Sequence, residues 1–502
     1  MKVQQFTGGL ATRMRPQFLQ TNEGAEYTNI DSLLGTLAPV RAKVRTAEAL
    51  DAFHAYYRAK DIWVSQAEPT DFLEYNKKLY YTNRKSKQVV FDGDATFNIS
   101  IVAPTKLVDL VVAPTPTGLA GVIQYAMTFV NQASGVESTP SPISTELDLT
   151  GGGSVTFTNL PTSTDPQVTR KRLYRLGNNL TTLTRVAELA FNTASYTDSL
   201  DDLSIEGSVL TTASNGVVPS TIAYFTEMRA MLYGAVANKL MFTNIGEPWN
   251  WPASNYLLFD DDITGIASTA NGLLVHTEFR THLVTGTGPS TLATQLLSGD
   301  QGCVAFESIA SIGQVAMWAS TAGVCLSNGS EVIVVSKDKL GPLNLTPLSA
   351  VAYDEVYYLS NSDGTILAFD FSLGKIFKTF SINVSMLAVA KGKLYGWKAN
   401  TQYELFSATT TEQFTYLSPR FIEGRATELK TYKKVYIYSK GVIIIDIIID
   451  DEVVATGSFD GEDSHMIQVP QDKQRGFFIQ FRVQGTGEVY EIEYVVGDRV
   501  ND

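Results

Sequence analysis

The sequence predicts an all-β protein with a β-propeller of about six blades, an inserted immunoglobulin- or fibronectin-like sandwich and a C-terminal β-sandwich. Three observations lead to this prediction. Helical periodicity is scarce, whereas 25 Phe and 23 Tyr suit the half-buried surfaces of strands. A pattern of short strands and turns recurs roughly every 40 residues. The residue composition and the strand pattern also change twice along the chain, over 104–210 and after residue 407.

The propeller prediction depends on the repeated pattern. Each unit has an aliphatic anchor, an aromatic or apolar strand, a turn and usually a second strand. A first unit lies near Leu79, and the five later anchors are 33, 42, 41 and 38 residues apart. These anchors are Leu240, Leu273, Val315, Val356 and Leu394. A period of about 40 residues with several strands per unit is typical of propeller blades.

The domain boundaries follow from the interruptions of this period. Leu79 and Leu240 are 161 residues apart, and the Thr- and Ser-rich segment between them has the turn spacing of a sandwich. Past residue 407, six β-prone segments are joined by turns at 440–441, 450–451 and 485–487. The predicted domains are an N-terminal segment with the first part of the propeller, an inserted sandwich, the remaining propeller and a C-terminal antiparallel domain, at 1–103, 104–210, 211–407 and 408–502.

Two segments carry specific structural expectations. One helix is predicted over 46–59, because Leu50, Phe53 and Tyr57 follow helical spacing and Thr46 can cap it. The isoleucine-rich stretch 443–449 is predicted to be a strand covered on both faces, since an exposed strand of this composition would promote aggregation.

Charge and cysteine content restrict the classes of partner. The net charge of −13 argues against a protein that wraps DNA or docks on anionic lipid through a basic face. Cys303 and Cys325 have no CxxC partner and are expected to be buried free thiols. The first residues lack a long apolar run, and 441–450 is too short to span a bilayer. We therefore expect a soluble chain, made in a cytoplasm, without membrane insertion.

The glycine-rich stretch Val284–Cys303, VTGTGPSTLATQLLSGDQGC, invites comparison with phosphate-binding loops. A P-loop requires a Lys after its second glycine, and this stretch has none. A dinucleotide-binding loop requires a third glycine and a following helix, and neither is expected here. A tight turn in an all-β chain is the better interpretation.

Other candidate sites are weak. His276 and His282 are six residues apart, which would place both on one face of a continuous strand, but no third metal ligand stands beside them. Asp260–Asp262 and Asn361–Gly364 could bind a cation, although both occur where turns are expected. Trp249 and Trp251 could stack on a sugar, but burial at a blade end is the commoner use. No catalytic, cofactor-binding or metal-binding residue is assigned, and no cofactor is expected.

The stretch Phe242–Leu326 resembles the tail nozzle, tail-hub or packaged-DNA stabilisation proteins of short-tailed bacteriophages. The resemblance is carried by FTNIGEPWNWP, GIASTANGLLVHTEFRTHLVTGTG and GDQGCVAFESIASIGQVAMWASTAGVCL, and it extends more loosely over 1–106 and 327–407. The inserted module, with QYAMTFVNQASGVESTPSPIS, RKRLYRLGNN and ASYTDS, is similar to the fibronectin-like or immunoglobulin-like modules of such phage proteins.

This resemblance implies a structural component of the virion tail without enzymatic activity, synthesised in the host bacterial cytoplasm. It implies a homohexameric distal nozzle ring that attaches to a portal-adaptor ring and carries tail fibre, spike or needle proteins. DNA would be retained by the ring and ejected through its channel without specific binding. Val284–Cys303 would then be a connection between blades on the propeller rim.

Two alternatives from other functional classes stay open. A propeller glycosidase would need paired carboxylates that converge on an axial pocket. A carbohydrate-binding adhesin or receptor-binding protein would use Trp249, Trp251 and tyrosines as a stacking platform.

Overall fold

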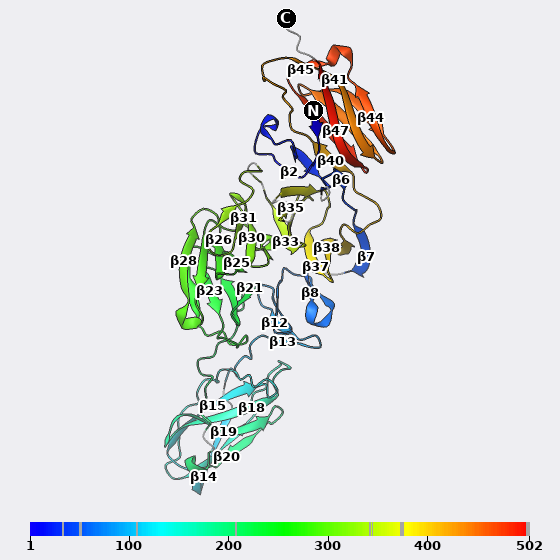
Figure 1. The fold of residues 1–502 in the computed structure, drawn as a ribbon. Coiled ribbons are helices and arrows are strands. Elements are labelled where there is room, and N and C mark those ends of the chain that lie inside the picture. Colours follow the sequence, from blue (N-terminus) through cyan, green and yellow to red (C-terminus); the bar gives the residue numbers. More distant parts are fainter. Residues whose placement is uncertain are drawn as a thin grey trace. The chain divides into compact units, whose positions relative to one another are not determined.

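Strands make up nearly all of the regular structure of the protein (Figure 1). The computed structural model describes residues 1–32, 35–49, 53–106, 109–205, 208–340, 343, 345–371 and 376–497. Within these ranges no α-helix occurs, and the predicted all-β class is confirmed. The helical turns are 3-10 turns: η1 (Pro16–Phe18), η2 (Arg58–Lys60), η3 (Asp202–Ser204), η4 (Pro289–Thr291), η5 (Phe306–Ser308) and η6 (Gln471–Lys473).

Residue contacts divide the chain into two compact units. Unit 1 comprises 1–68, 261–285 and 293–502, and unit 2 comprises 69–260 and 286–292. Unit 2 contains two four-stranded antiparallel sheets of the blade type, in which each strand pairs with the next along the chain. Their strands are β10 (Asp71–Tyr75), β11 (Lys78–Thr82), β12 (Gln88–Phe91) and β13 (Thr96–Asn98), then β21 (Ala223–Met228), β22 (Met231–Val236), β23 (Lys239–Phe242) and β24 (Tyr256–Leu258).

Unit 1 contains four further blade-type sheets. Two are simple meanders, one forms the first four strands of a nine-stranded sheet, and one has the order β37-β38-β39-β7. Their strands are β25 (Ile263–Ser268), β26 (Leu273–Thr277), β27 (Thr281–Thr285), β28 (Ala293–Ser298), β29 (Ala310–Ile312), β30 (Val315–Ser320), β31 (Gly323–Ser327), β32 (Ile333–Val334), β33 (Pro347–Tyr353), β34 (Val356–Asn361), β35 (Ile366–Asp370), β36 (Ile376–Phe380), β37 (Met386–Ala390), β38 (Lys393–Lys398), β39 (Thr401–Glu404) and β7 (Val44–Ala49).

The described residues thus contain six blade-type sheets. In one of these sheets, the anchor residue predicted from the sequence lies on a different strand than in the other five. The other five anchors lie on or beside the second strand of a sheet, whereas Leu240 lies on β23, a third strand. The equivalent strand is β22, which begins at Met231. Both strands of this hairpin are short and apolar, so either satisfies the pattern.

The helix predicted over 46–59 is wrong. Val44–Ala49 is strand β7, which pairs with β39, and β8 (Phe53–Tyr57) pairs with β9 (Ile62–Gln66). Leu50 lies outside the described residues. The apolar spacing of this segment is compatible with a helix. Its first part nevertheless forms a strand, because β39 presents a sheet edge and β7 pairs with it as the last strand of the sheet.

The inserted sandwich consists of a three-stranded and a four-stranded antiparallel sheet, ordered β14-β17-β20 and β16-β15-β18-β19. Tyr125 on β15 and Phe157 on β17 meet edge to face across the sandwich, with ring centroids 4.8 Å apart. The strands are β14 (Asp109–Leu119), β15 (Val122–Val130), β16 (Leu147–Asp148), β17 (Gly153–Thr158), β18 (Arg170–Gly177), β19 (Leu180–Ala190) and β20 (Tyr196–Asp198).

The C-terminal module is built from both ends of the chain, unlike the predicted domain 408–502. One sheet has the order β1-β47-β41-β44, with β45 also paired to β41, and the nine-stranded sheet continues from β36 through β4-β40-β46-β42-β43. The strands are β1 (Lys2–Val3), β4 (Glu26–Thr28), β40 (Phe414–Leu417), β41 (Lys430–Lys440), β42 (Ile443–Ile449), β43 (Glu452–Phe459), β44 (Glu462–Gln468), β45 (Arg475–Gly476), β46 (Ile479–Gly485) and β47 (Glu488–Gly497). Four short strands, β2 (Gly9–Leu10), β3 (Glu23–Gly24), β5 (Ile30–Asp31) and β6 (Ala38–Pro39), pair as β2-β3 and β5-β6.

Along the isoleucine-rich strand β42, buried and exposed side chains alternate more than the sequence predicted. Ile443, Ile445 and Ile447 are fully buried, whereas Ile444 is 37% exposed. Asp446 shares the outward face and accepts a hydrogen bond from Thr456 at 2.7 Å. The strand is therefore protected less by cover on both faces than by its central place between β43 and β46. No helix in the described parts of the chain is long and apolar enough to cross a bilayer.

Candidate functional site

The segment Glu247–Pro252, EPWNWP, occupies the junction between the inserted sandwich and the β21–β24 sheet of unit 2. Trp251 is 1% exposed, its indole N–H donates to the carbonyl of Pro248 at 3.1 Å, and its ring packs near Phe225. Trp249 is half-buried and packs instead against the core of the sandwich. The two tryptophans therefore pack into different modules, and together they do not form an exposed stacking platform.

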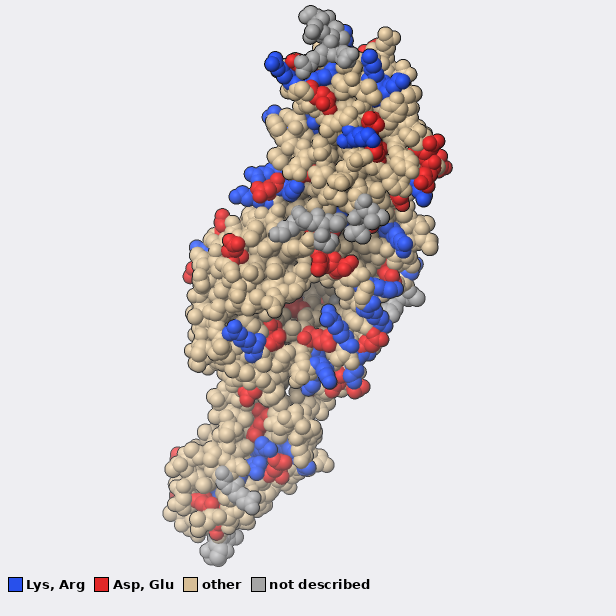
Figure 2. Space-filling model, viewed as in Figure 1, with Lys and Arg blue, Asp and Glu red and all other residues tan. Residues whose placement is uncertain are grey.

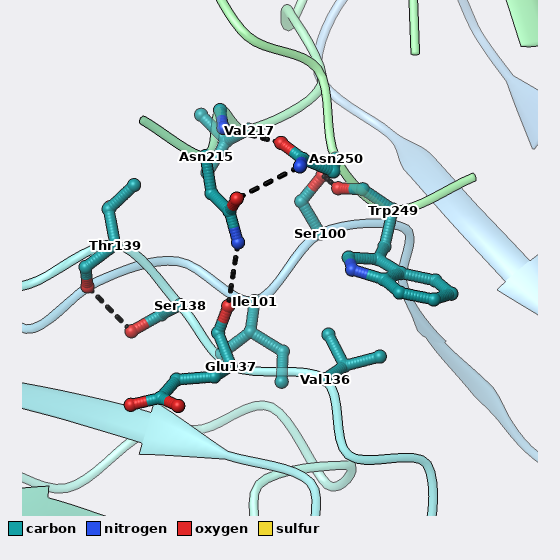
Figure 3. A pocket seen from close by; sticks show the side chains of 11 residues that line it. Ser100, Ile101, Val136, Glu137, Ser138, Thr139, Asn215, Val217, Trp249 and Asn250 are labelled. Atoms are coloured by element: carbon teal, nitrogen blue, oxygen red, sulfur yellow. Dashed lines mark hydrogen bonds between the residues drawn. The ribbon is translucent and has the colours of Figure 1, made fainter. Parts of the chain in front are cut away.

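Polar side chains complete this junction (Figure 3). The hydroxyl of Ser100 donates to the carbonyl of Trp249 at 2.6 Å and accepts from the amide of Val218 at 3.0 Å. Asn250 accepts from the amide of Gly216 at 3.0 Å and donates to the side chain of Asn215 at 2.9 Å. Three chain segments that are far apart in sequence are thereby connected by side-chain hydrogen bonds.

The sandwich contributes the other half of the junction. The hydroxyl of Thr212 donates to the carbonyl of Ser138 at 2.8 Å, and the Asn215 amide reaches the carbonyl of Glu137 at 3.4 Å. A pocket of about 10 Å³ lies among these residues, which is the room of a single water molecule. This size suits a packed joint between modules rather than a ligand-binding cleft.

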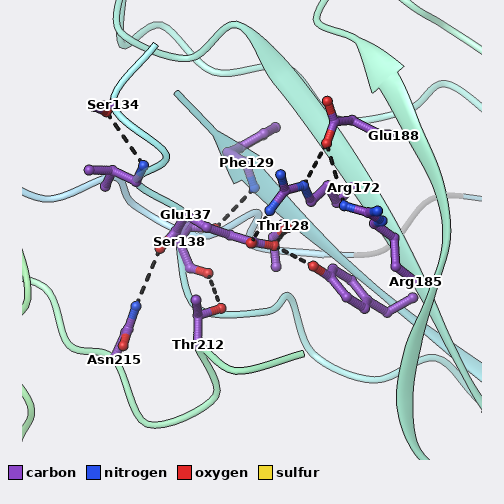
Figure 4. Close-up of polar contacts among 12 residues, drawn as sticks. Thr128, Phe129, Ser134, Glu137, Ser138, Arg172, Arg185, Glu188, Thr212 and Asn215 are labelled. Atoms are coloured by element: carbon purple, nitrogen blue, oxygen red, sulfur yellow. Dashed lines mark hydrogen bonds and ion pairs between the residues drawn. The ribbon is translucent and has the colours of Figure 1, made fainter. Parts of the chain in front are cut away.

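Next to the pocket, the carboxylate of Glu137 accepts hydrogen bonds from three side chains of the sandwich (Figure 4). Thr128 donates at 2.5 Å, Tyr174 at 2.7 Å and Arg172 at 2.6 Å, and Arg172 also donates to Glu188 at 2.8 Å. Burial, together with the hydrogen bond to Glu137, raises the pKa of Tyr174. Because several fixed donors hold this carboxylate, its arrangement suits positioning of the 136–141 loop rather than proton transfer.

The glycine-rich stretch is partly a hairpin within one blade sheet, which corrects the expected connection between blades. Residues 286–292 join β27 to β28, and only the end of the stretch leads on to the next sheet. The hydroxyl of Thr291 accepts from the amides of Thr287 and Gly288, both at 3.0 Å. The loop thus binds its own amide groups, which are the donors that a phosphate would need.

The two histidines lie on neighbouring strands of one hairpin, not on one continuous strand as expected. His276 is fully buried, its Nδ1 lies 2.9 Å from the hydroxyl of Thr281, and its ring centroid is 4.5 Å from that of Trp318. Burial, with a smaller effect of His282, lowers the pKa of His276 to about 3. A neutral imidazole packed in this way serves as part of the core.

The carboxylate candidates do not assemble into a centre. Asp260, Asp261 and Asp262 are all exposed. Asn361 begins the turn between β34 and β35, in which the Asp363 carboxylate accepts from the amide of Thr365 at 2.8 Å. Among the residues that the structure describes, no group of three or more His, Cys, Asp or Glu side chains could hold a metal ion.

Both cysteines are free and buried, in agreement with the expectation from the sequence. The thiol of Cys303 contacts the carbonyl of Ala305 at 3.1 Å, and that of Cys325 lies 3.2 Å from the hydroxyl of Ser320. Burial raises the pKa of Cys303 to about 12 and that of Cys325 to about 11. Thiols with such pKa values are poor nucleophiles at neutral pH, which fits a packing role.

Sequence reasoning did not identify the residues that join the modules. Ser100, Asn215 and Asn250 carry no recognisable motif, and Glu137 lies in a Ser-rich loop. The one available signal was Trp249-Asn250-Trp251 between two prolines, which marks a rigid loop with buried aromatic rings.

No family model matches the sequence, and no curated protein matches it. Solved structures with weak similarity include the computationally designed Ika8 protein, at 12% identity and a TM-score of 0.29 over 73% of this chain and 98% of that chain. They also include BamB from Moraxella catarrhalis, at 11% identity and a TM-score of 0.25 over 61% of this chain and 99% of that chain. BBS1N in complex with ARL6DN has 9% identity and a TM-score of 0.30 over 73% of this chain and 99% of that chain. At these TM-scores the similarity carries no argument, and the fold assignment rests on the six sheets of the chain itself.

Proposed function

We propose that this protein is a structural subunit of a short-tailed phage tail and forms the distal nozzle ring with five further copies of itself. The observation that carries the proposal is the position of the resembling stretch Phe242–Leu326. It spans all of β25–β28 and continues through β29, β30 and β31, so the similarity lies in the repeating core of the fold and not in one loop.

The surface of unit 1 supports assembly with other copies. Leu296 on β28 is 54% exposed and Ile333 on β32 is 44% exposed, and each lies on the last strand of its blade sheet. A closed ring needs one surface patch to meet a different patch on the next subunit. Apolar side chains on outer strands suit the centre of such an interface.

The charge of the chain supports a channel through which DNA slides. The net charge is −13, and on the face in Figure 2 the Lys and Arg side chains lie among Asp and Glu side chains. Because affinity for duplex DNA depends on clustered basic contacts with phosphates, a surface of this kind does not retain it. The ring would be joined to the portal through an adaptor ring and would carry fibres, spikes or a needle at its distal end.

The proposal is tested on virions that contain the chain. Quantitative mass spectrometry should count six copies per particle, and cryo-electron microscopy should place them in one closed ring of the tail. A single copy per tail would overturn the proposal. Release of reducing sugars from host polysaccharide by the purified chain would favour a glycosidase instead.

DNA binding provides an independent test. Purified protein should show no measurable affinity for duplex DNA at physiological salt in an anisotropy titration. Tight binding that weakens steeply with rising salt would indicate basic contacts with phosphates and would contradict a sliding channel.

A further inference from the structure

Three asparagine–glycine pairs occur in the sequence, at 215–216, 271–272 and 328–329. Such pairs are prone to deamidation, because a glycine without Cβ lets its backbone nitrogen approach the side chain of the preceding residue. The nitrogen attacks only after any hydrogen bond that it donates has been broken. The three pairs are alike in sequence, but the hydrogen bonds of their glycine amides differ.

The first and third pairs have glycine amides that are held by a side-chain oxygen. The amide of Gly216 donates to the side chain of Asn250 at 3.0 Å. The amide of Gly329 donates to the hydroxyl of Ser327 at 2.9 Å, and Ser327 is buried. Both nitrogens must therefore lose a hydrogen bond before they can attack the preceding asparagine.

The second pair lies in the turn between β25 and β26, which contacts the β29–β32 sheet. The amide of Ala270 donates to the carbonyl of Gln314 at 3.2 Å. The amide of Asn271 donates to the carbonyl of Asn328 at 3.3 Å. Within the described residues, the amide of Gly272 donates no hydrogen bond. Asn271 is exposed, so its side-chain amide is accessible to water.

The packing of this turn explains why a glycine follows Asn271. A Cβ at position 272 would lie 2.5 Å from the carbonyl oxygen of Val284, which is closer than such atoms approach. The fold therefore requires glycine here, and the reactive pair follows from that requirement.

We propose that Asn271 deamidates spontaneously in the folded protein. The nitrogen of Gly272 bonds to Cγ of Asn271, the bond from Cγ to Nδ2 breaks, and ammonia leaves with the proton that the nitrogen gave up. A cyclic succinimide remains. Water then opens the ring at either carbonyl, which yields an aspartyl or an isoaspartyl residue. The reaction consumes only water and needs neither an oxidant nor a reductant.

The product changes the contact between two blade sheets. Nδ2 of Asn271 donates to the hydroxyl of Ser330 at 2.9 Å, and this donor is lost as ammonia. A carboxylate takes its place, and the isoaspartyl product also lengthens the backbone of the turn. Because the amides of Ala270 and Asn271 bond to the β29–β32 sheet, hydrogen exchange at these two positions should be faster in the modified fraction.

The ranking of the three pairs is tested on the full chain. The folded protein is incubated at mildly alkaline pH, and peptide mapping by mass spectrometry follows each pair with time. Deamidation at Asn271 should be at least about fivefold faster than at Asn215 or Asn328, whose glycine amides must first lose a hydrogen bond. The denatured chain is the reference and should show similar rates at all three pairs. A rate at Asn271 that does not exceed the other two in the folded chain would overturn the proposal.

A variant tests the role of the glycine amide directly. Ser327→Ala removes the acceptor of the Gly329 amide and should speed deamidation at Asn328 by about fivefold. The matched control is Ser458→Ala, which alters an exposed serine on β43 and should leave this rate unchanged. An unchanged rate at Asn328 in Ser327→Ala would contradict the reason given for the reactivity of Asn271. The reaction does not depend on assembly into a tail, so the result is independent of the copy number in virions.

Discussion

The guanidinium of Arg175 donates to the carboxylate of Asp198 at 2.6 Å, and both side chains are completely shielded from solvent. Arg175 lies on β18 and Asp198 on β20, so this ion pair connects the two sheets of the inserted sandwich. Tyr125 of β15 donates to the same carboxylate at 2.7 Å, and Asp202 is a second partner of Arg175 at 2.9 Å. Such a pair is costly to break from one side, because Arg175 then keeps only Asp202 as a counterion and the buried Tyr125 hydroxyl loses its acceptor.

Replacement of Asp198 should therefore loosen the sandwich strongly. We expect Asp198→Ala to reduce the free energy of opening of β18 and β20 by about 3–5 kcal/mol, measured by hydrogen exchange in the full chain. Asp338→Ala removes an exposed partner of Arg13 and should leave exchange in these strands unchanged. Equal protection in the Asp198→Ala variant and the natural chain would contradict a structural role for the ion pair.

The two tryptophans of the junction should respond differently to truncation. Trp251→Ala removes a fully buried ring and should cost about 3–5 kcal/mol of stability in the β21–β24 sheet. Trp249→Ala removes a half-buried ring that packs on the sandwich, so it should increase cleavage between sandwich and blade while leaving β21–β24 protected. Limited proteolysis followed by mass spectrometry distinguishes these results. Similar cleavage maps for the two variants would indicate a single packing unit.

The same junction is tested by producing the sandwich alone and by deleting it from the chain. The segment 104–210 should fold alone, because both of its sheets and most of their shared core lie within it, with Ile101 and Trp249 contributing from outside. Its replacement by a short Gly/Ser bridge should leave the remaining sheets folded, although Trp249 becomes exposed. Circular dichroism and thermal unfolding check both the isolated segment and the shortened chain, and cooperative loss of all structure after deletion would refute modularity.

His276 should make stability depend on pH. The unfolded chain protonates this imidazole near its ordinary pKa of 6.5, whereas the folded chain resists protonation until about pH 3. Its contribution to stability is therefore complete above pH 6.5 and is progressively lost as the pH falls. At pH 5 the loss is about 2 kcal/mol. The stability advantage of the natural chain over His276→Gln should shrink by this amount between pH 7 and pH 5, and a constant difference would contradict the assignment.

The buried cysteines should be inert in the folded protein. At pH 8, the raised pKa values of Cys303 and Cys325 leave about one thiol in a thousand or fewer as thiolate. Ellman titration should therefore count neither cysteine promptly in the native chain and both after denaturation without reductant. Finding no thiol after denaturation would mean that the two residues form a disulfide.

The features that the sequence predicted well are local ones. Asp450 and Asp451 both have positive φ, as a tight hairpin turn requires, and the strands on either side begin and end at this turn. The helix predicted over 46–59 is wrong because its apolar spacing also suits a strand. The segment begins as strand β7 because it pairs with β39, which lies about 350 residues further along the chain. The phase error at Leu240 arose because two arms of one hairpin look alike.

The junction could not be predicted for a different reason. Ser100 meets Val218 and Trp249 across 118 and 149 residues, and neither Ser100 nor Val218 belongs to a motif. Hydrogen bonds between distant loops leave no periodic trace in the sequence, since each loop position tolerates many polar residues.

The placement of the first strands in sheets completed last has a consequence for translation. Lys2 and Val3 pair with residues 493 and 492, and β7 pairs with β39. At elongation rates of about 5–20 residues per second, these strands emerge from the ribosome roughly 20–100 s before their partners. The nascent chain must therefore keep its first strands unpaired, and open to chaperones, while the intervening sheets form. The last blade and the C-terminal module then become complete only after β39 and β47 have been synthesised.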